Sequence, residues 1–372
     1  MKIIGIICEY NPFHNGHLYH LKKIKEMYPD SLIILVLNGY FLERGDVSII
    51  SKKNKTILAL EYGIDLVVEL PFVYGTQSAD VFANISIKIL EELKCEYIIF
   101  GSECNNIDKL NEITDYTLNN LEEYNKSVKE YLNQGLNYPT ALAKAVNIDF
   151  EFNSNDLLGI SYLKSIKSNN YKIKPLTIKR TNNYLDTTST DEIISATNIR
   201  NKLQNNIDIF KYVPSNTLDF IENISLNNFF NLIKYKIITE HDLSIYLDVD
   251  EGIDYRLKKV INKCNNTDEL IEKTKSKRYT YNKIRRMLIH ILIGFTKNDN
   301  KKITLDYIKI LGFNNNGQKY LNSIKKDINT PLIPNKNSLN YKYELKASLI
   351  YDMILENNNF SFETNNKPIK YN

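Results

Sequence analysis

The sequence has 372 residues, a length that predicts two or more domains, and its 43% hydrophobic and 25% charged residues are ordinary for a globular protein. Its four cysteines form no C-x-x-C pair and no disulfide spacing, which disfavours a cysteine zinc site and a secreted disulfide framework. No signal peptide is apparent, and no apolar run approaches the ~18 residues that span a bilayer. We therefore expect a soluble, cytoplasmic protein with no membrane association.

Charge is divided unevenly along the chain. Residues 1–200 carry 21 basic and 25 acidic side chains, a balance of −4, whereas residues 201–372 carry 27 and 19, a balance of +8. This asymmetry predicts that the two parts have different roles and that the basic second part binds a polyanion.

Strand and helix signals alternate through the first 200 residues. Apolar runs predict strands over Ile3–Cys8, Leu32–Leu37, Asp65–Leu70, Tyr97–Phe100 and Ile173–Ile178. Helices are predicted over Gly16–Met27, from an N-cap at Ser51 to Gly63, over Ser78–Leu93, over Leu157–Ile166 and from about Ala196. Repeated βα units predict an α/β fold with a doubly wound parallel sheet, interrupted by a helical insertion at about 105–150. Ligands of such sheets bind outside the carboxyl ends of the strands.

Beyond about residue 205 the strand signals fade. Helical patterns cover Leu218–Ile237, Asp242–Leu247, Thr267–Thr274, Tyr281–Phe295, Leu305–Leu311, Gln318–Lys326 and Tyr343–Leu355. We therefore predict one domain over 1–204 and a mainly α-helical domain over 205–372, with a loose polar tail from about Glu363.

The segment Cys8-Glu9-Tyr10-Asn11-Pro12-Phe13-His14-Asn15-Gly16-His17 follows the first strand and leads into a helix. Gly16 allows backbone to approach a ligand closely, and a helix start directs N–H groups and a positive dipole end at an anion. His14 and His17 could hydrogen-bond a phosphate as charge builds there. The alternative is a chance H-x-G-H in which a histidine simply caps the helix.

Other strands also end in polar motifs. Asn38 to Asp46 (NGYFLERGD) follows the second strand and carries Arg44, which suits a phosphate or a carboxylate or is simply solvated. Gly101-Ser102-Glu103 follows the fourth strand, where adenine or ribose could pack on the glycine, unless this is an ordinary turn. Lys179-Arg180 follows the fifth strand. Ser195, Thr197 and Arg200 open the next helix as a second candidate anion site, although Ser and Thr are also common caps.

The H-x-G-H after the first strand and the I-S-x-T-x-I-R after the last resemble the HxGH nucleotidyltransferase superfamily. A closer resemblance to the bacterial tRNA(Met) cytidine acetate ligase family lies in EYNPFHNGHLYHL, NGYFLERGD, GSEC, LNYPTALA, DLLGISYLK, PLTIKRTNNYLD, IISATNIR and SKRYTYNKIRRML. It implies a Rossmann-like nucleotidyltransferase domain over 1–204 that binds ATP and a helical domain over 205–372 that binds tRNA. It also implies that ATP and acetate form acetyl-adenylate, whose acetyl group passes to N4 of the wobble cytidine of elongator tRNA(Met).

The same resemblance implies the residues of the site. ATP contacts would come from Ile7, Cys8, Glu9, Tyr10, Asn11, Pro12, Phe13, His14, Asn15, Gly16, His17, Leu18, Tyr19 and His20, and from Gly101, Asn155 and Arg180. His14 and His17 would stabilise phosphate charge, while Ser195, Thr197 and Arg200 would hold the triphosphate tail. Arg44 or a backbone N–H is the candidate for the acetate pocket. The family usually has Pro-Asn-Asn where Ser154-Asn155-Asp156 stands, Gly at the position of Asn105 and Gln at that of Glu43.

Basic residues concentrate between Arg256 and Arg286, a segment that contains 11 basic and 3 acidic side chains. Basic groups interleaved with tyrosines suit phosphate contacts and base stacking on RNA, although a charge run is often only a solvated helix face. The predicted RNA-binding residues are Lys273, Lys275, Lys277, Arg278, Tyr279, Lys283, Arg285 and Arg286.

No cluster has the spacing of metal ligands, so any metal is expected to be Mg²⁺ that arrives with ATP, and no transition metal is expected. His241 and His290 are expected in caps or core, and no obligate protein partner is evident. Two other functions remain open at this point. A small-molecule adenylyltransferase that makes a nucleotide cofactor would use both phosphate motifs but not the basic domain. A non-enzymatic RNA-binding protein would retain only a relict nucleotide site.

Overall fold

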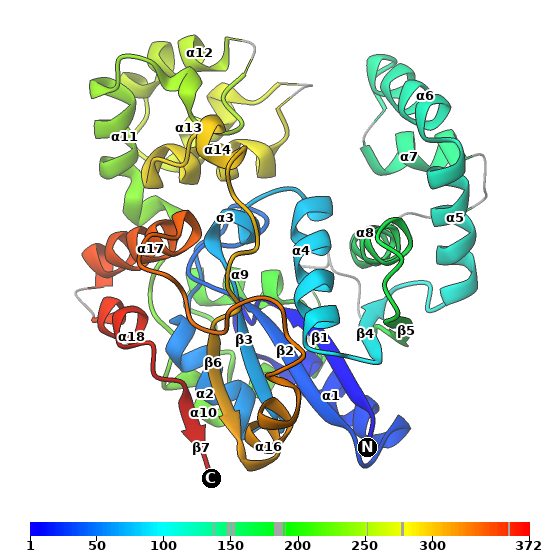
Figure 1. The fold of residues 1–372 in the computed structure, drawn as a ribbon. Coiled ribbons are helices and arrows are strands. Elements are labelled where there is room, and N and C mark those ends of the chain that lie inside the picture. Colours follow the sequence, from blue (N-terminus) through cyan, green and yellow to red (C-terminus); the bar gives the residue numbers. More distant parts are fainter. Residues whose placement is uncertain are drawn as a thin grey trace. The chain divides into compact units, whose positions relative to one another are not determined.

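A computed structural model describes residues 1–136, 138–146, 150, 153–181, 189, 191–250, 252–276, 279–355 and 358–372 (Figure 1). Its strands form a seven-stranded sheet in the order β5-β4-β1-β2-β3-β6-β7. The chain divides into two compact units. The first unit comprises Met1–Ile7, His14–Ile34 and Ala79–Val213, and the second comprises Cys8–Phe13, Leu35–Ser78 and Pro214–Asn372. The domain boundary between 204 and 205 stays a prediction.

The first unit is built from parallel βα segments. Its elements are β1 (Ile3–Cys8), α1 (Asn15–Met27), α4 (Ala79–Glu92), β4 (Tyr97–Ser102), α5 (Ile107–Asn119), α6 (Leu121–Asn133), α7 (Tyr138–Val146), α8 (Ser154–Ser168), β5 (Lys174–Lys179) and α9 (Ala196–Gln204). β4 pairs in parallel with β1 on one side and with β5 on the other. A Cβ on Gly5 would lie 2.6 Å from the Leu90 side chain, so α4 packs directly on β1. The carboxyl ends of these strands therefore meet at one edge.

The predicted insertion at 105–150 is helical where it is described. Helix α5 packs against α8, and α6 packs against α7 (Figure 1). Residues 137 and 147–149 of the predicted insertion lie outside the described part of the chain.

The second unit combines strands with most of the helices of the carboxyl-terminal half. Its elements are the larger part of β2 (Leu32–Asn38), then α2 (Lys52–Glu61), β3 (Leu66–Leu70), α3 (Phe72–Gly75), α10 (Ser215–Leu218), α11 (Phe230–Thr239), α12 (Ile253–Val260), α13 (Thr267–Thr274), α14 (Tyr281–Ile293), α15 (Lys297–Asn300), β6 (Ile310–Asn314), α16 (Asn315–Ile324), α17 (Leu339–Leu355), α18 (Asn359–Asn365) and β7 (Ile369–Tyr371). Helices α11 to α14 pack together at one end of this unit (Figure 1). β6 is antiparallel to β3 and parallel to β7.

The predicted α/β class and all five predicted strands are confirmed, and helix α2 begins after its Ser51 cap as expected. Three predictions for the second half were wrong. The run Leu305–Leu311 is not a helix but leads into strand β6, because a short apolar run has no periodicity that separates the two structures. The predicted helix over Leu218–Ile237 is not continuous: α10 ends at Leu218, a 3₁₀ helix covers Leu226–Phe229, and α11 begins at Phe230. The polar residues after Glu363 are not a loose tail, since Glu363 is fully buried and β7 joins the sheet.

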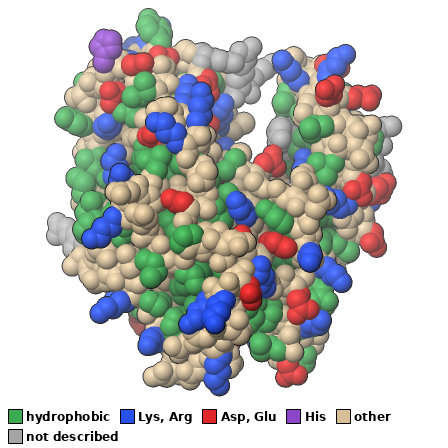
Figure 2. All heavy atoms as spheres, in the orientation of Figure 1, with side chains coloured by type: hydrophobic (Ala, Val, Ile, Leu, Met, Phe, Trp, Pro, Cys, Tyr) green, Lys and Arg blue, Asp and Glu red, His purple; other side chains and the backbone are tan. Residues whose placement is uncertain are grey.

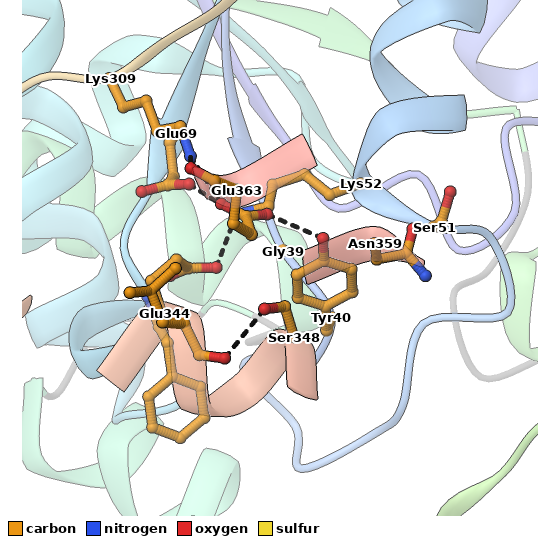
Figure 3. Close-up of polar contacts among 12 residues, drawn as sticks. Gly39, Tyr40, Ser51, Lys52, Glu69, Lys309, Glu344, Ser348, Asn359 and Glu363 are labelled. Carbon is orange, nitrogen blue, oxygen red and sulfur yellow. Dashed lines mark hydrogen bonds and ion pairs between the residues drawn. The ribbon is translucent and has the colours of Figure 1, made fainter. Parts of the chain in front are cut away.

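A buried ion cluster ties these late elements to α2 and β3 (Figure 3). The Lys52 ammonium lies 2.5 Å from the Glu69 carboxylate, 2.6 Å from Glu344 and 2.8 Å from Glu363. Lys309 pairs with Glu363 at 2.6 Å. We call these five residues the Lys52 cluster. Among the described residues its three carboxylates are the group that could hold a metal ion, but the Lys52 ammonium already occupies the centre between them.

The charges within the Lys52 cluster depend on one another. Burial alone would lower the pKa of Lys52, but Glu344, Glu363 and Glu69 raise it well above its ordinary value. Burial raises the pKa of Glu344 to about 7, whereas Lys52 and Lys309 outweigh burial at Glu363 and lower its pKa. The cluster therefore stays paired only while both lysines are present.

We predict that Lys52→Met destabilises the protein by roughly 3–5 kcal/mol, because it leaves three buried carboxylates without their shared cation. Chemical denaturation measures the free energy of unfolding. The control is Lys23→Ala, which removes an exposed pair with Glu26 and should cost less than about 1 kcal/mol. A Lys52 variant as stable as the control would contradict this account.

Candidate functional site

Two histidines close the start of helix α1 as a reciprocal cap. His14 Nδ1 accepts a hydrogen bond from the backbone N–H of Gly16 at 3.0 Å, and His17 Nδ1 accepts one from the N–H of His14 at 3.1 Å. Because both Nδ1 atoms are acceptors, each neutral ring carries its proton on Nε2. The two ring centroids are 4.0 Å apart, so a pair of Nε2–H donors stands at one helix terminus.

Both imidazoles are held in the neutral form. Burial, followed by the charges of Arg180 and Arg200, lowers the pKa of His14 to about 3. Burial, followed by His14, His20 and Arg180, lowers the pKa of His17 well below its usual value. At neutral pH these rings act as hydrogen-bond donors without a charge of their own.

Gly16 is required at this cap by the position of the His14 ring. A Cβ on residue 16 would lie 2.6 Å from His14 Cε1. A side chain there would push the ring out of its cap and would cover the N–H groups of the helix start.

The loop after β4 is locked to the start of α8 by two carboxylates. Glu103 accepts hydrogen bonds from the Asn155 side chain at 2.6 Å and from the backbone N–H groups of Asn155 and Asp156 at 3.1 Å. Asp156 in turn accepts from the Ser102 hydroxyl at 2.5 Å and from the Cys104 N–H at 3.1 Å. These hydrogen bonds of the Glu103 and Asp156 carboxylates fix the end of β4, where Gly101 lies. Asn155 is thus placed here by Glu103, and its contact with a nucleotide stays a prediction.

Asn105 occupies a position that suits glycine. Its φ is +52°, a left-handed conformation that Asn tolerates better than most residues, and its N–H donates to the Ser102 hydroxyl at 2.8 Å. The departure from the glycine of the family pattern therefore leaves this turn intact.

Arg180 crosses over Gly101 from the end of β5. A Cβ on Gly101 would lie 3.2 Å from Arg180 Cγ, so any side chain at position 101 would displace the guanidinium. Arg180 Nε lies 3.9 Å from the Glu103 carboxylate, and its backbone N–H donates to Ser102 at 3.0 Å. Its charge also lowers the pKa of His14, His17 and His20.

Helix α9 begins next to helix α1. The Asn15 side chain donates to the backbone oxygens of Glu192 at 3.2 Å and Lys211 at 2.9 Å, and a Cβ on Gly16 would lie 3.4 Å from Ile193. Ser195 caps α9 by accepting from the N–H of Asn198 at 3.1 Å. The first unit thus brings two helix N-termini to one place.

The start of α9 also carries Arg200. This side chain donates to the Thr197 hydroxyl at 3.4 Å, one turn from the cap. Arg180 and Arg200 with two helix N-termini make a candidate site for an extended anion, to which the His14 and His17 Nε2–H groups would add uncharged donors. This arrangement can hold a polyphosphate and stabilise charge that develops on it.

The second unit fixes the loops that follow β1 and β2 through a buried lysine. Lys55 Nζ donates to the backbone oxygens of Glu9 at 3.0 Å and of Asn38 and Gly39 at 2.7 Å. The Glu9 carboxylate accepts from the Asn38 side chain at 3.0 Å and from the Glu43 N–H at 2.8 Å. Burial lowers the pKa of Lys55 to about 7. Lys55 is not among the residues predicted from the sequence, where its only signal is its place one turn after Lys52.

The predicted RNA-binding residues differ in exposure and in their partners. Lys273 and Lys275 are exposed, whereas Tyr279 is buried and donates its hydroxyl to the Asp250 carbonyl. Lys283 lies over the Tyr279 ring at 4.6 Å. Arg285 and Arg286 are paired with acidic side chains of the loop after β2. Lys277 and Arg278 lie outside the described residues.

A family model described as HIGH Nucleotidyl Transferase matches residues 1–366. The chain is 38% identical to a tRNA(Met) cytidine acetate ligase of Geobacillus sp. over 95% of both chains. It is 39% identical to one of Caldicellulosiruptor saccharolyticus over 88% of this chain and 86% of that one. The chain belongs to the HIGH nucleotidyl transferase family, among the tRNA(Met) cytidine acetate ligases. The family and the enzyme class inferred from the motifs are therefore confirmed.

Solved structures agree with this assignment along the whole chain. The crystal structure of apo Thermotoga maritima TmcAL covers 100% of this chain and 99% of its own with a TM-score of 0.89 and 27% identity. The same protein bound with alpha-thio ATP gives a TM-score of 0.87 and 26% identity. None of the helices within the described residues is long and apolar enough to cross a membrane.

We predict that His14 and His17 stay neutral with the proton on Nε2 from pH 5 to pH 8. The reason is burial beside Arg180 and the use of both Nδ1 atoms as acceptors. Nitrogen-15 NMR of histidine-labelled protein measures both the tautomer and the titration. A midpoint near pH 6.5 for either ring would contradict this interpretation.

Proposed function

We propose that this protein uses ATP to join acetate to N4 of the wobble cytidine of elongator tRNA(Met), giving N4-acetylcytidine. The observation that carries the proposal is the anion site of the first unit, where two helix N-termini, two arginines and two Nε2–H donors converge. Relatives that match this chain over about nine-tenths of its length bear the name tRNA(Met) cytidine acetate ligase. We place the reaction in the cytoplasm, where tRNA is found.

In the first step an acetate oxygen attacks the α-phosphorus of ATP. The bond from the α-phosphorus to the bridging oxygen breaks, and its electron pair leaves with pyrophosphate, so the products are acetyl-adenylate and pyrophosphate. Arg180, Arg200 and the start of α9 would hold the phosphates. His14 and His17 would donate from Nε2 as negative charge increases on the phosphates. Since the phosphoryl group needs mainly positioning and electrostatic stabilisation, no covalent nucleophile of the protein is required.

In the second step the N4 amine of cytidine attacks the acetyl carbonyl carbon. The bond between that carbon and the phosphate oxygen breaks, AMP leaves with the electron pair, and the amine loses one proton. The cytidine must leave its stack to reach the adenylate. Arg44, with 29% of its side chain exposed beside Glu43, is our candidate for the acetate carboxylate.

We propose that Mg²⁺ enters with ATP and is held by its phosphates and by water. The only three-carboxylate group among the described residues surrounds the Lys52 ammonium, which supports a metal carried by the nucleotide rather than by a protein cage. Bound there, Mg²⁺ would supply further positive charge to the phosphates.

The proposed tRNA surface lies on α12 and α13, and Figure 2 shows basic side chains, with acidic ones among them, at the end of the second unit that α11 to α14 form. Arg256 Nε donates to the backbone oxygen of Lys273, and Lys273 donates to that of Lys263, so these residues lie together. Tyr255 is 72% exposed, which suits stacking on a base.

The deciding experiment incubates the protein with ATP, Mg²⁺, isotope-labelled acetate and unmodified tRNA(Met), followed by mass spectrometry of the tRNA nucleosides. Labelled N4-acetylcytidine at the wobble position is the expected result. Pyrophosphate exchange that depends on a mononucleotide instead of acetate would favour an adenylyltransferase. Absence of any ATP turnover would leave only a binding role.

We predict that His17→Ala lowers acetate-dependent ATP–pyrophosphate exchange by about 10²–10³-fold, because one oriented donor is lost. The affinity for tRNA should not change. The matched control is His241→Ala, since His241 is exposed, and this variant should exchange normally. Normal exchange in the His17 variant would refute the role of this donor.

We predict that Lys273→Ala combined with Lys275→Ala weakens tRNA binding and reduces the slope of its salt dependence by about 1–2. Binding is measured by filter retention at several salt concentrations. Lys301→Ala with Lys302→Ala removes the same charge from another exposed site of the second unit and should leave the slope unchanged. Equal effects of both double variants would argue against this surface.

A further inference from the structure

The loop after β2 folds into a tight turn whose tip is Glu43-Arg44-Gly45-Asp46. Phe41 and Val47 pair across its base, and the Leu42 N–H donates to the Asp46 carbonyl at 2.9 Å. The Gly45 N–H donates back to the Leu42 carbonyl, also at 2.9 Å. We call residues 43–46 the ERGD turn. It presents Arg44, the proposed acetate ligand.

The ERGD turn rests against helix α14. The φ of Gly45 is +74°, and a Cβ there would lie 2.6 Å from the backbone of both Arg285 and Arg286, so the backbones of turn and helix are in contact. Arg286 Nη1 donates to the Glu43 carbonyl at 3.1 Å and lies 3.5 Å from its carboxylate. Arg285 forms an ion pair with Asp46.

The same turn is joined to the loop after β1. The Glu43 N–H donates to the Glu9 carboxylate at 2.8 Å, and the Glu9 carbonyl accepts from Lys55. Glu9 lies five residues before His14 in the chain. Thus Arg286 holds the carbonyl side of Glu43 while Glu9 holds its N–H.

We propose that Arg285 and Arg286 are positioning residues for acetate activation: they seat the ERGD turn, and with it Arg44 and Glu9, rather than contact RNA. Only 19% and 14% of their side chains are exposed, and RNA phosphates could engage them only by displacing Asp46 and Glu43. This inference rests on the proposed function, since it assigns the turn to the acetate site.

The test is acetate-dependent ATP–pyrophosphate exchange without tRNA, measured for Arg286→Met and Arg285→Met. Each should lose on the order of tenfold or more in kcat/KM for acetate, because small displacements of positioning groups are costly. The affinity for tRNA should stay within about twofold. The control, Lys167→Met, removes an ion pair with Asp115 on the surface of the first unit and should exchange normally.

Two further measurements separate positioning from a general loss of folding. Burial raises the pKa of Glu43, Arg286 and Arg44 lower it, and Glu9 and Asp46 raise it. Removal of Arg286 should therefore raise this pKa further and shift the acid limb of exchange to higher pH.

Asp46→Arg combined with Arg285→Asp should exchange several-fold better than either single variant, because the pair is restored with reversed charge.

The outcomes distinguish the inference from the proposed function. Wild-type protein without acetate-dependent exchange would overturn the proposed function and this inference with it. Active wild type alongside a fully active Arg286→Met would overturn the inference alone. Loss of tRNA affinity with a reduced salt slope and normal exchange would identify these arginines as RNA contacts and would equally overturn it.

Discussion

The architecture of the second unit depends on one buried ammonium, that of Lys52, and the three carboxylates around it. The ammonium joins α2 and β3 to two helices contributed by the last part of the chain, α17 and α18. The loop after β2 rests on this cluster, because a Cβ on Gly39 would lie 3.1 Å from the Glu344 carboxylate and the Tyr40 hydroxyl donates to Glu363 at 2.7 Å. One turn further along α2, Lys55 binds the loop carbonyls. The ion cluster thereby sets the base of the turn whose tip carries Arg44.

The two units use charge in opposite ways. In the second unit, buried cations are matched by carboxylates and serve to hold elements together. In the first unit, Arg180 and Arg200 adjoin helix N-termini and imidazoles whose pKa values are lowered, so the site is prepared for an anion that comes from outside. Neutral Nε2–H donors suit a reaction in which charge builds on phosphate, because their hydrogen bonds to the phosphate strengthen as that charge increases.

The sequence predicted the α/β class, the strands up to β5 and the motifs at their ends, because apolar runs and caps are local signals. The ion cluster could not be predicted, since Lys52, Glu344 and Glu363 are separated by almost the whole chain and polar residues near its end resemble a tail. Local charge also led us to group Arg285 and Arg286 with the exposed lysines 273 and 275. The two arginines are distinguished from these lysines only by their contacts with Glu43 and Asp46, which the structure shows. The reciprocal lock of Glu103 and Asp156 was likewise invisible, because each carboxylate binds backbone that lies more than fifty residues away.

We propose that acetate attacks the α-phosphorus of ATP bound at the candidate anion site of the first unit, and the fate of the acetate oxygens shows whether it does. Acetate labelled with oxygen-18 on both oxygens is turned over with ATP and tRNA(Met), and the released AMP and pyrophosphate are analysed by mass spectrometry. We expect one labelled oxygen in AMP and none in pyrophosphate, because the attacking oxygen stays on phosphorus when the acetyl group leaves. Unlabelled AMP, or label in pyrophosphate, would contradict an acetyl-adenylate intermediate.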